Sequence, residues 1–197
     1  ERLLAEIHRV HREHRESCGA VKTWRALNRE GVTCGKHRVA RLRRAHGIEA
    51  RRKRRFRIIT EHHHTAAAAP DLVQRKFEAP VPNRVWVGDM TFVRTRQGWL
   101  YLAVLLDLFS RRVVGWAMAA QPNQMLVRSA LEMALHQRRP PAGLVHHSDR
   151  GAVYAARDYR ERLDAVRAHP SMGGKKTAYD NAVAESFFSN LKNELVH

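Results

Sequence analysis

Three apolar, β-rich runs follow one another between residues 85 and 118, and short turns separate them. The first is VWVGDMTFV (85–93) and the third is VVGWAM (113–118). Between them, WLYLAVLLD (99–107) is almost entirely apolar, which is typical of a strand buried on both faces of a sheet. The runs therefore predict three antiparallel strands in a meander. The tryptophans that they contain are predicted to be core residues: Trp86, Trp99 and Trp116.

Helices alternate with a further strand in the rest of this region. Asn123 is predicted to cap a helix that runs to about residue 137, and GLVHHSD (143–149) is predicted to be a fourth strand. The remaining predicted elements are a helix at 155–166, a loop at 172–180 and a final helix through Val196. This order predicts an α+β or α/β fold, a mixed sheet flanked by helices, of the ribonuclease H-like kind.

The front of the chain is strongly basic. Residues 1–65 contain 18 Lys and Arg against 7 Asp and Glu, and the formal net charge of the whole chain is +17. Such a charge favours a polyanionic partner. The apolar spacing predicts helices at 1–16, 20–30 and 35–46, with Thr33 able to cap the third. A helix, a glycine-containing turn and a basic helix are typical of a helix-turn-helix that binds DNA, although an ordinary helical pair with a solvated basic face is the alternative.

Two groups of basic side chains are predicted to contact DNA. The third helix is expected to point its basic residues largely outward, Arg43 included, and four of them are predicted DNA contacts: Lys36, Arg38, Arg41 and Arg44. The segment that follows is predicted to form an arm along the phosphates: Arg51, Arg52, Lys53, Arg54 and Arg55. A solvated charged loop is the alternative for this arm.

Two aspartates stand out in the predicted sheet. Asp89 lies among apolar residues of the first strand, where an unpaired carboxylate costs several kcal/mol to desolvate. Asp149 ends the fourth strand, and Gly151 follows it where the backbone has to turn away. In a sheet with this order the first and fourth strands are neighbours. We therefore expect Asp89 and Asp149 to meet at one edge of the sheet.

The final helix supplies a third carboxylate. With about 100° of rotation per residue, Asn181, Ser189 and Lys192 fall on the same side as Glu185. The opposite, core side is predicted to hold four apolar residues: Ala184, Phe187, Leu191 and Leu195. A lone helix with this pattern is usually an amphipathic helix with a solvated face. Three carboxylates brought together, however, are hard oxygen ligands suited to Mg²⁺ or Mn²⁺. Two such ions can clamp a phosphodiester for in-line displacement.

Four stretches of this chain resemble the catalytic protein of IS3-family bacterial insertion sequences, in the DDE transposase and retroviral-integrase superfamily: VWVGDMTFV, GWLYLAVLLDLFSRRVVGWAM, HHSDRG and YDNAVAESFFSNLKNEL. The 35 residues between Asp149 and Glu185, and a basic residue seven positions after the glutamate, strengthen the resemblance. It implies that Asp89, Asp149 and Glu185 form the catalytic, metal-binding triad, and that Lys192, with Asn181 on its stripe, contacts the element's DNA. Family members continue beyond Leu195, so this chain is interpreted as a trimmed one.

The resulting organisation has three parts. We predict a helix-turn-helix domain with its arm at 1–60, a linker at 61–82 and a ribonuclease H-like catalytic core, truncated at its C-terminus, at 83–197. The predicted function is a DNA transposase that uses two Mg²⁺ or Mn²⁺ ions for strand cleavage and transfer. A catalytically silent DNA-binding protein and a ribonuclease H-type nuclease are the alternatives.

The same interpretation predicts the partners and the compartment. The expected partner is double-stranded DNA, both the terminal inverted repeats of the element and its target, with a homo-oligomer assembled on that DNA. No membrane partner and no small-molecule substrate are expected. Two cysteines and no recognisable signal peptide favour the bacterial cytoplasm, near the nucleoid.

Overall fold

The computed structural model describes residues 1–51, 69–174 and 181–196. The chain divides into two compact units, one formed by residues 1–59 with 190–197 and the other by residues 60–189. Each unit has its own hydrophobic core and is described by itself. The predicted arm residues Arg52, Lys53, Arg54 and Arg55 lie outside the described residues.

The first unit contains the three predicted helices: α1 (Arg2–Glu13), α2 (Ala20–Arg29) and α3 (Lys36–Ala45). Aliphatic side chains from all three helices and from the turn after α3 form its core: Ile7, Val10, Leu27, Val39 and Ile48. The prediction that Thr33 caps the third helix is wrong. Gly35 is the N-cap of α3 and makes no side-chain cap, because the helix begins two residues later than a cap at Thr33 requires.

The second unit begins with the predicted meander: β1 (Val85–Thr95), β2 (Gly98–Asp107) and β3 (Val113–Ala119). β2 pairs antiparallel with both neighbours, and one row across the sheet runs from Asp89 through Val104 to Trp116. β1 and β2 extend further toward each other than the sequence suggested. The first turn therefore shortens to residues 96–97.

The remaining elements are α4 (Gln124–Arg138), β4 (Val145–Ser148), α5 (Ala152–Ala155), α6 (Arg157–Ala165), β5 (His169–Met172), α7 (Ala182–Leu191) and a π-helix (Lys192–Val196). Asn123 caps α4 as predicted, because its side chain accepts a hydrogen bond from the Leu126 N–H at 3.0 Å. The single helix predicted at 155–166 is instead two. Ala156 adopts an extended conformation that separates α5 from α6.

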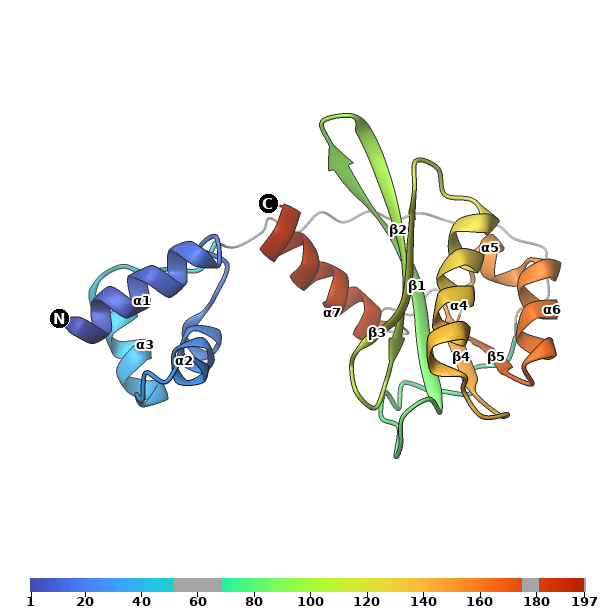
Figure 1. The fold of residues 1–197 in the computed structure, drawn as a ribbon, viewed down its shortest axis with the longest axis horizontal. Coiled ribbons are helices and arrows are strands. Elements are labelled where there is room, and N and C mark those ends of the chain that lie inside the picture. The colour runs from blue at the N-terminus through green and yellow to red at the C-terminus, as the bar shows by residue number, and fades with distance from the viewer. Residues whose placement is uncertain (52–68, 175–180, 197) are drawn as a thin grey trace. The chain divides into compact units, whose positions relative to one another are not determined.

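The five strands form one mixed sheet in the order β3-β2-β1-β4-β5. β4 is parallel to β1, and β5 is parallel to β4. Helices α4, α5 and α6 lie on one side of the sheet and the first turns of α7 lie on the other (Figure 1). The predicted mixed sheet flanked by helices is thus confirmed.

Gly115 in β3 permits close packing of α4 on the sheet. A Cβ at this position would lie 2.2 Å from the backbone oxygen of Ala130 and 2.8 Å from the Cβ of Ala134. Backbone oxygen cannot move away as a flexible side chain would. Only glycine therefore allows the helix to approach β3 so closely.

The tryptophans of the sheet have different environments. Trp86 is fully buried, as predicted, but 52% of Trp99 and 45% of Trp116 remain exposed. The core prediction is wrong for these two, because Trp116 lies on an edge strand and Trp99 is the second residue of β2, next to the hairpin turn. No described helix of the chain combines the length and the apolar character that crossing a membrane requires.

Candidate active site

Asp89 and Asp149 lie on neighbouring parallel strands, as the sequence predicts. The paired register of β1 and β4 ends at Val87 and His147. Asp89 stands two residues beyond Val87, and Asp149 stands two residues beyond His147, just after β4 ends. The two aspartates therefore occupy equivalent positions just beyond the paired β1–β4 register, with Asp89 in the middle of β1 and Asp149 directly after β4.

The side-chain directions on β1 show which face Asp89 occupies. A Cβ built on Gly88 would meet His146 Nε2 at 3.0 Å and Tyr154 at 3.6 Å, so position 88 faces β4's buried histidine and α5. Successive residues of a strand point to opposite faces. Asp89 therefore projects from the other face, on the side where Figure 1 shows the first turns of α7.

The aspartates are accessible and are held partly by their own backbone. Asp89 is half-buried, and its Oδ1 accepts the Met90 N–H at 2.7 Å. Asp149 is exposed, and its Oδ1 accepts the Gly151 N–H at 2.9 Å, which closes the turn predicted at this glycine. These local hydrogen bonds restrict the orientation of each carboxylate.

The pKa of the buried Tyr154 is affected by the charges of both aspartates. Burial raises the pKa of Tyr154 well above its ordinary value, and the negative charges of Asp89 and Asp149 raise it further. The ring also lies against the positions of Gly88 and Gly151, the glycines beside the two aspartates. The local sequence does not reveal that Tyr154 lies near the aspartates, because one tyrosine in a short helix forms no characteristic pattern.

The first turn of α7 is connected to β1 close to Asp89. Asn181, at the start of this helix, donates from Nδ2 to the Gly88 backbone oxygen at 3.1 Å, and its own backbone oxygen accepts the Glu185 N–H at 3.0 Å. Glu185 is exposed one turn further on. Asn181 is only 7% exposed, so the expectation that it shares an exposed stripe with Glu185 is not met.

The end of this helix differs from the expected continuous α-helix. The buried residues of α7 are Ala184 and Phe188, whereas Phe187 is half-buried. Lys192 begins the π-helix, whose i→i+5 hydrogen bonds change the rotation per residue. The helical wheel that placed Lys192 above Glu185 therefore does not hold beyond Leu191.

The three carboxylates suit a divalent ion by their chemistry, since all are hard oxygen donors. Within residues 1–51, 69–174 and 181–196, no three His, Cys, Asp or Glu side chains are grouped so as to hold a metal ion. The structure thus places Asp89 and Asp149 at the same level of two neighbouring inner strands, and it places the first turns of α7 on the face from which Asp89 projects. Glu185 is not grouped with the two aspartates as a metal site requires.

Other polar residues near these strands have structural environments. Asp107 is fully buried and accepts hydrogen bonds from Asn83 N at 2.9 Å and from Ser110 N and Oγ at 3.0 and 2.6 Å, so it stabilises the turn after β2. His146 and His147 are both buried.

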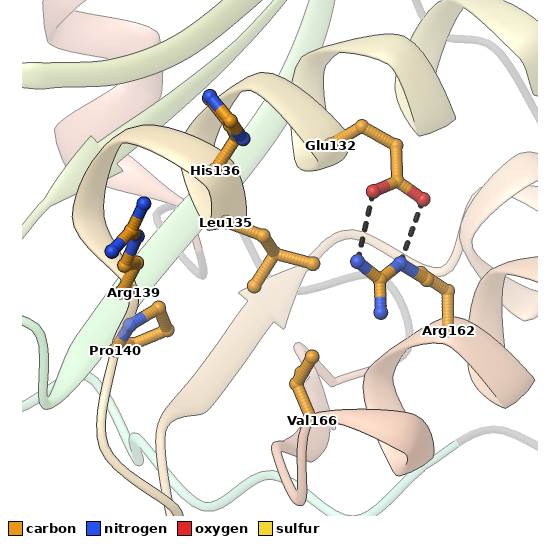
Figure 2. Close-up of a pocket in the computed structure, with 7 residues that line it drawn as sticks. All are labelled: Glu132, Leu135, His136, Arg139, Pro140, Arg162 and Val166. Atoms are coloured by element: carbon orange, nitrogen blue, oxygen red, sulfur yellow. Dashed lines mark hydrogen bonds and ion pairs between the residues drawn. The ribbon is translucent and has the colours of Figure 1, made fainter.

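A separate pocket of about 280 Å³ lies between α4 and α6 (Figure 2). Arg162 donates two hydrogen bonds across it to Glu132, at 2.7 and 2.9 Å. This ion pair lowers the pKa of Glu132 and neutralises much of the charge that lines the pocket. None of the predicted site residues lines it.

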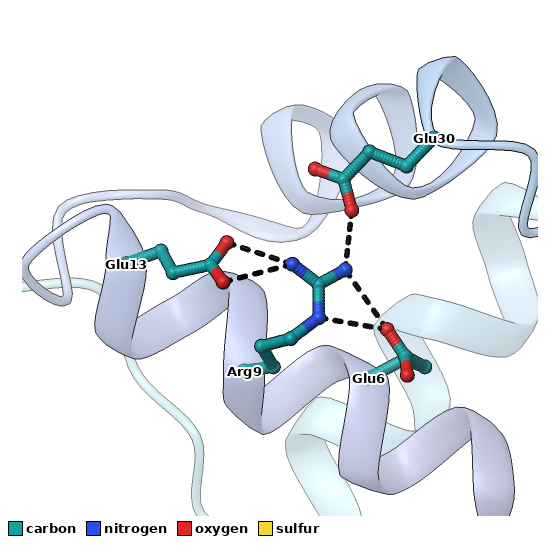
Figure 3. Close-up of polar contacts among 4 residues, drawn as sticks. All are labelled: Glu6, Arg9, Glu13 and Glu30. Atoms are coloured by element: carbon teal, nitrogen blue, oxygen red, sulfur yellow. Dashed lines mark hydrogen bonds and ion pairs between the residues drawn. The ribbon is translucent and has the colours of Figure 1, made fainter.

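The third helix of the first unit carries exposed positive charge. Four of its predicted DNA contacts are exposed: Lys36, Arg38, Arg41 and Arg44. On α1, by contrast, Arg9 contacts the carboxylates of Glu6, Glu13 and Glu30 (Figure 3). The α3 sequence KHRVARLRRA contains no acidic residue. The outer face of α3 is therefore basic.

Arg43 does not belong to that face. It is 4% exposed, and its guanidinium donates to Thr23 Oγ1 at 3.0 Å and to the Cys18 backbone oxygen at 2.9 Å. Burial lowers its pKa. The expectation that Arg43 points outward is therefore wrong, because Val39 and Arg43 lie one turn apart on the inner face of α3.

Both units match known families. Residues 1–56 match a family described as an HTH-like domain, and residues 79–178 match the integrase core domain. A 31 kDa protein of insertion element IS600 from Shigella sonnei is 43% identical over 98% of this chain and 71% of its own length. The IS904 transposase of Lactococcus lactis is 37% identical over 99% of this chain and 77% of its own length. The InsF transposase of IS3A from Escherichia coli is 38% identical over 91% and 62%, respectively.

The chain belongs to the IS3 family of insertion-sequence transposases.

A solved structure agrees with the fold of this IS3-family chain. The cryo-EM structure of a simian T-cell lymphotropic virus intasome, in complex with a PP2A regulatory subunit, contains a chain that is 16% identical and matches with a TM-score of 0.54. The match covers 94% of the IS3-family chain and 58% of the viral one. This chain and the intasome chain therefore share a fold, in agreement with the ribonuclease H-like fold that the sequence predicts.

Proposed function

We propose that this IS3-family chain cleaves DNA strands at the ends of its insertion sequence and transfers them to target DNA, in a reaction that requires divalent metal ions. Asp89, Asp149 and Glu185 would hold two Mg²⁺ or Mn²⁺ ions, which would supply Lewis-acid activation of the attacking water or 3′-hydroxyl and stabilisation of the leaving oxygen. The proposal rests above all on the equivalent positions of Asp89 and Asp149, each two residues beyond the last paired residues of the parallel strands β1 and β4.

Each acidic residue has a distinct part in this proposal. Asp89 presents a half-buried carboxylate from the sheet face, and Asp149 presents an exposed one from the turn after β4. Glu185 completes the set from α7 when ions and DNA are bound.

The DNA partner is held by basic surfaces away from these carboxylates. The exposed face of α3, with Arg38 and Arg41 at its centre, enters a groove of the terminal repeat, and the arm that begins at Arg51 follows the phosphates. Lys192 contacts the end DNA near the cleaved bond. Because an insertion sequence has two ends that must be joined to one target, the active form is a homo-oligomer assembled on DNA. This substrate places the activity in the bacterial cytoplasm, at the nucleoid.

Nicking of a duplex that carries the element's own end tests the proposal. Asp89→Asn, Asp149→Asn and Glu185→Gln each abolish Mg²⁺-dependent nicking and leave DNA binding unchanged, because the charge of α3 is untouched. Asp158→Asn, on the exposed side of α6, is the matched control and keeps wild-type activity.

Three outcomes would contradict it. Cleavage by Asp149→Asn at the wild-type rate would remove the aspartate from the site. A wild-type chain that binds the ends without nicking them would be a silent DNA-binding protein. Preferential cutting of RNA–DNA hybrids would make it a ribonuclease H-type nuclease.

A further inference from the structure

Asn181 is a buried polar residue that connects two parts of the candidate site. Its side-chain Nδ2 donates to the backbone oxygen of Gly88, the residue immediately before Asp89. Its backbone oxygen accepts the N–H of Glu185, one helical turn later. The same residue therefore joins the β1 segment that carries one carboxylate to the helical turn that carries another.

The Gly88 oxygen is available to Asn181 because of the local strand geometry. β1 and β4 pair only from Val85 to Val87 in their shared register, and Gly88 follows directly. A Cβ at Gly88 would come within 3.0 Å of His146 Nε2, so the backbone here lies close against a buried ring. A carbonyl held by such packing is a rigid acceptor for the asparagine.

The orientation of the Asn181 amide is determined by this acceptor. With the amide reversed, Oδ1 would face the Gly88 oxygen, and two acceptors would repel each other. Oδ1 is itself buried without a hydrogen-bond partner among the described residues. A buried amide oxygen without a partner is energetically unfavourable, and it is tolerated where the other half of the amide has a role.

We propose that Asn181 is the positioning residue that holds the first turn of α7 against β1, and so keeps the turn that carries Glu185 beside the strand that carries Asp89. The inference rests on the proposed function of the acidic triad. It assigns Asn181 a role inside the protein in place of the DNA contact that the sequence suggested. The residue touches neither the reacting atoms nor the DNA.

The consequence for ion binding follows from the position of this hydrogen bond. Without the amide, the start of α7 loses its polar contact with β1, and Glu185 samples more positions. A ligand that must first be ordered binds its ion more weakly, and the loss of a supporting hydrogen bond around a metal site typically costs about 10–100-fold in affinity or activity.

Direct measurement of Mn²⁺ binding by electron paramagnetic resonance on the full chain tests this role. Asn181→Ala is expected to bind Mn²⁺ about 10-fold or more weakly and to nick end DNA correspondingly more slowly. Its affinity for the end duplex stays at the wild-type value. Without any metal, the amides at the start of α7, including that of Glu185, exchange hydrogen faster. Asn190→Ala, an exposed asparagine on the same helix, is the matched control and changes none of these quantities.

The outcomes separate this inference from the proposed function. Wild-type Mn²⁺ affinity in Asn181→Ala overturns the positioning role, and slower nicking with weakened DNA binding then restores the DNA contact. If Asn181→Ala fails to fold, Asn181→Gln retains the donor on a longer stem and is expected to show reduced Mn²⁺ affinity with a folded chain. If Asp89→Asn and Glu185→Gln leave Mn²⁺ binding intact, the proposed triad itself is wrong, whatever Asn181 does.

Discussion

His146 Nε2 and the Tyr159 hydroxyl oxygen lie 2.9 Å apart and share a hydrogen bond in the interior of the second unit. His146 is 2% exposed, and burial lowers its pKa from 6.5 to about 4. The imidazole is therefore neutral in the folded protein at neutral pH. Its ring also lies against Gly88, so this buried pair supports the strand that carries Asp89.

Acid should destabilise the second unit through His146. The unfolded chain protonates this residue near pH 6.5, whereas the folded chain does so only near pH 4. The stability associated with the neutral imidazole is thus fully present above about pH 6.5 and is lost as the pH falls toward 4. The loss amounts to roughly 3 kcal/mol at most. Urea unfolding at a series of pH values should show a shallower dependence in His146→Gln, which keeps a hydrogen-bonding group but does not titrate.

The exposed His136 supplies the comparison for that experiment. His136→Gln should follow the wild-type pH dependence between 6.5 and 4. A His146→Gln variant with the wild-type dependence would show that this histidine protonates without cost in the folded protein.

Arg43 and Arg41 should differ in what they contribute, although they lie two residues apart on α3. Arg43→Ala leaves the Cys18 oxygen and Thr23 hydroxyl without their buried donor, and should lower the free energy of unfolding of the first unit by about 2–4 kcal/mol. Arg41→Ala removes an exposed side chain and should change stability by less than about 0.5 kcal/mol. Thermal unfolding followed by circular dichroism measures both. Equal stabilities for the two variants would contradict the structural role of Arg43.

The exposed arginines of α3 should carry salt-dependent DNA binding. Replacing Arg38 and Arg41 together by alanine should flatten the slope of log K against log salt concentration by about 2 units, since each removes about one phosphate contact. Arg9→Ala should leave the slope unchanged, because three glutamates already surround that guanidinium. Fluorescence anisotropy on an end duplex, across salt concentrations, gives the slopes. A double variant with the wild-type slope would exclude α3 from the phosphate contacts.

Gly115→Ala should destabilise the packing of α4 on β3. The added methyl group would overlap the Ala130 backbone oxygen, so the helix would have to move away from the sheet. Overpacking of this kind typically costs about 1–3 kcal/mol. Gly98→Ala tests strain at positive φ without such an overlap, since nothing lies within 4 Å of its Cβ position. Unfolding midpoints in urea compare the two variants, and a fully stable Gly115→Ala would show that α4 shifts freely.

Much of the candidate site follows from local sequence. The alternation and apolar content of 85–118 determine the three strands. Asn123 caps α4 by accepting a hydrogen bond from Leu126, only three residues further along the chain. The positions of the two aspartates follow from the strands, because Asp89 lies within β1 and Asp149 directly follows β4. These features depend on neighbours along the chain, whose backbone hydrogen bonds and side-chain preferences are encoded nearby.

Tertiary structure alone decided which side chains are enclosed. Arg43 is buried because Thr23 and Cys18 lie beside it, and Asn181 is buried because β1 passes the start of α7 at Gly88. Trp116 is exposed because its strand ends the sheet. Burial depends on surfaces that come from distant parts of the chain, so no periodicity within one segment can specify it. The sequence thus determined which strands carry Asp89 and Asp149. The packing of the sheet and α7 decided which side chains, such as Asn181, are buried beside them.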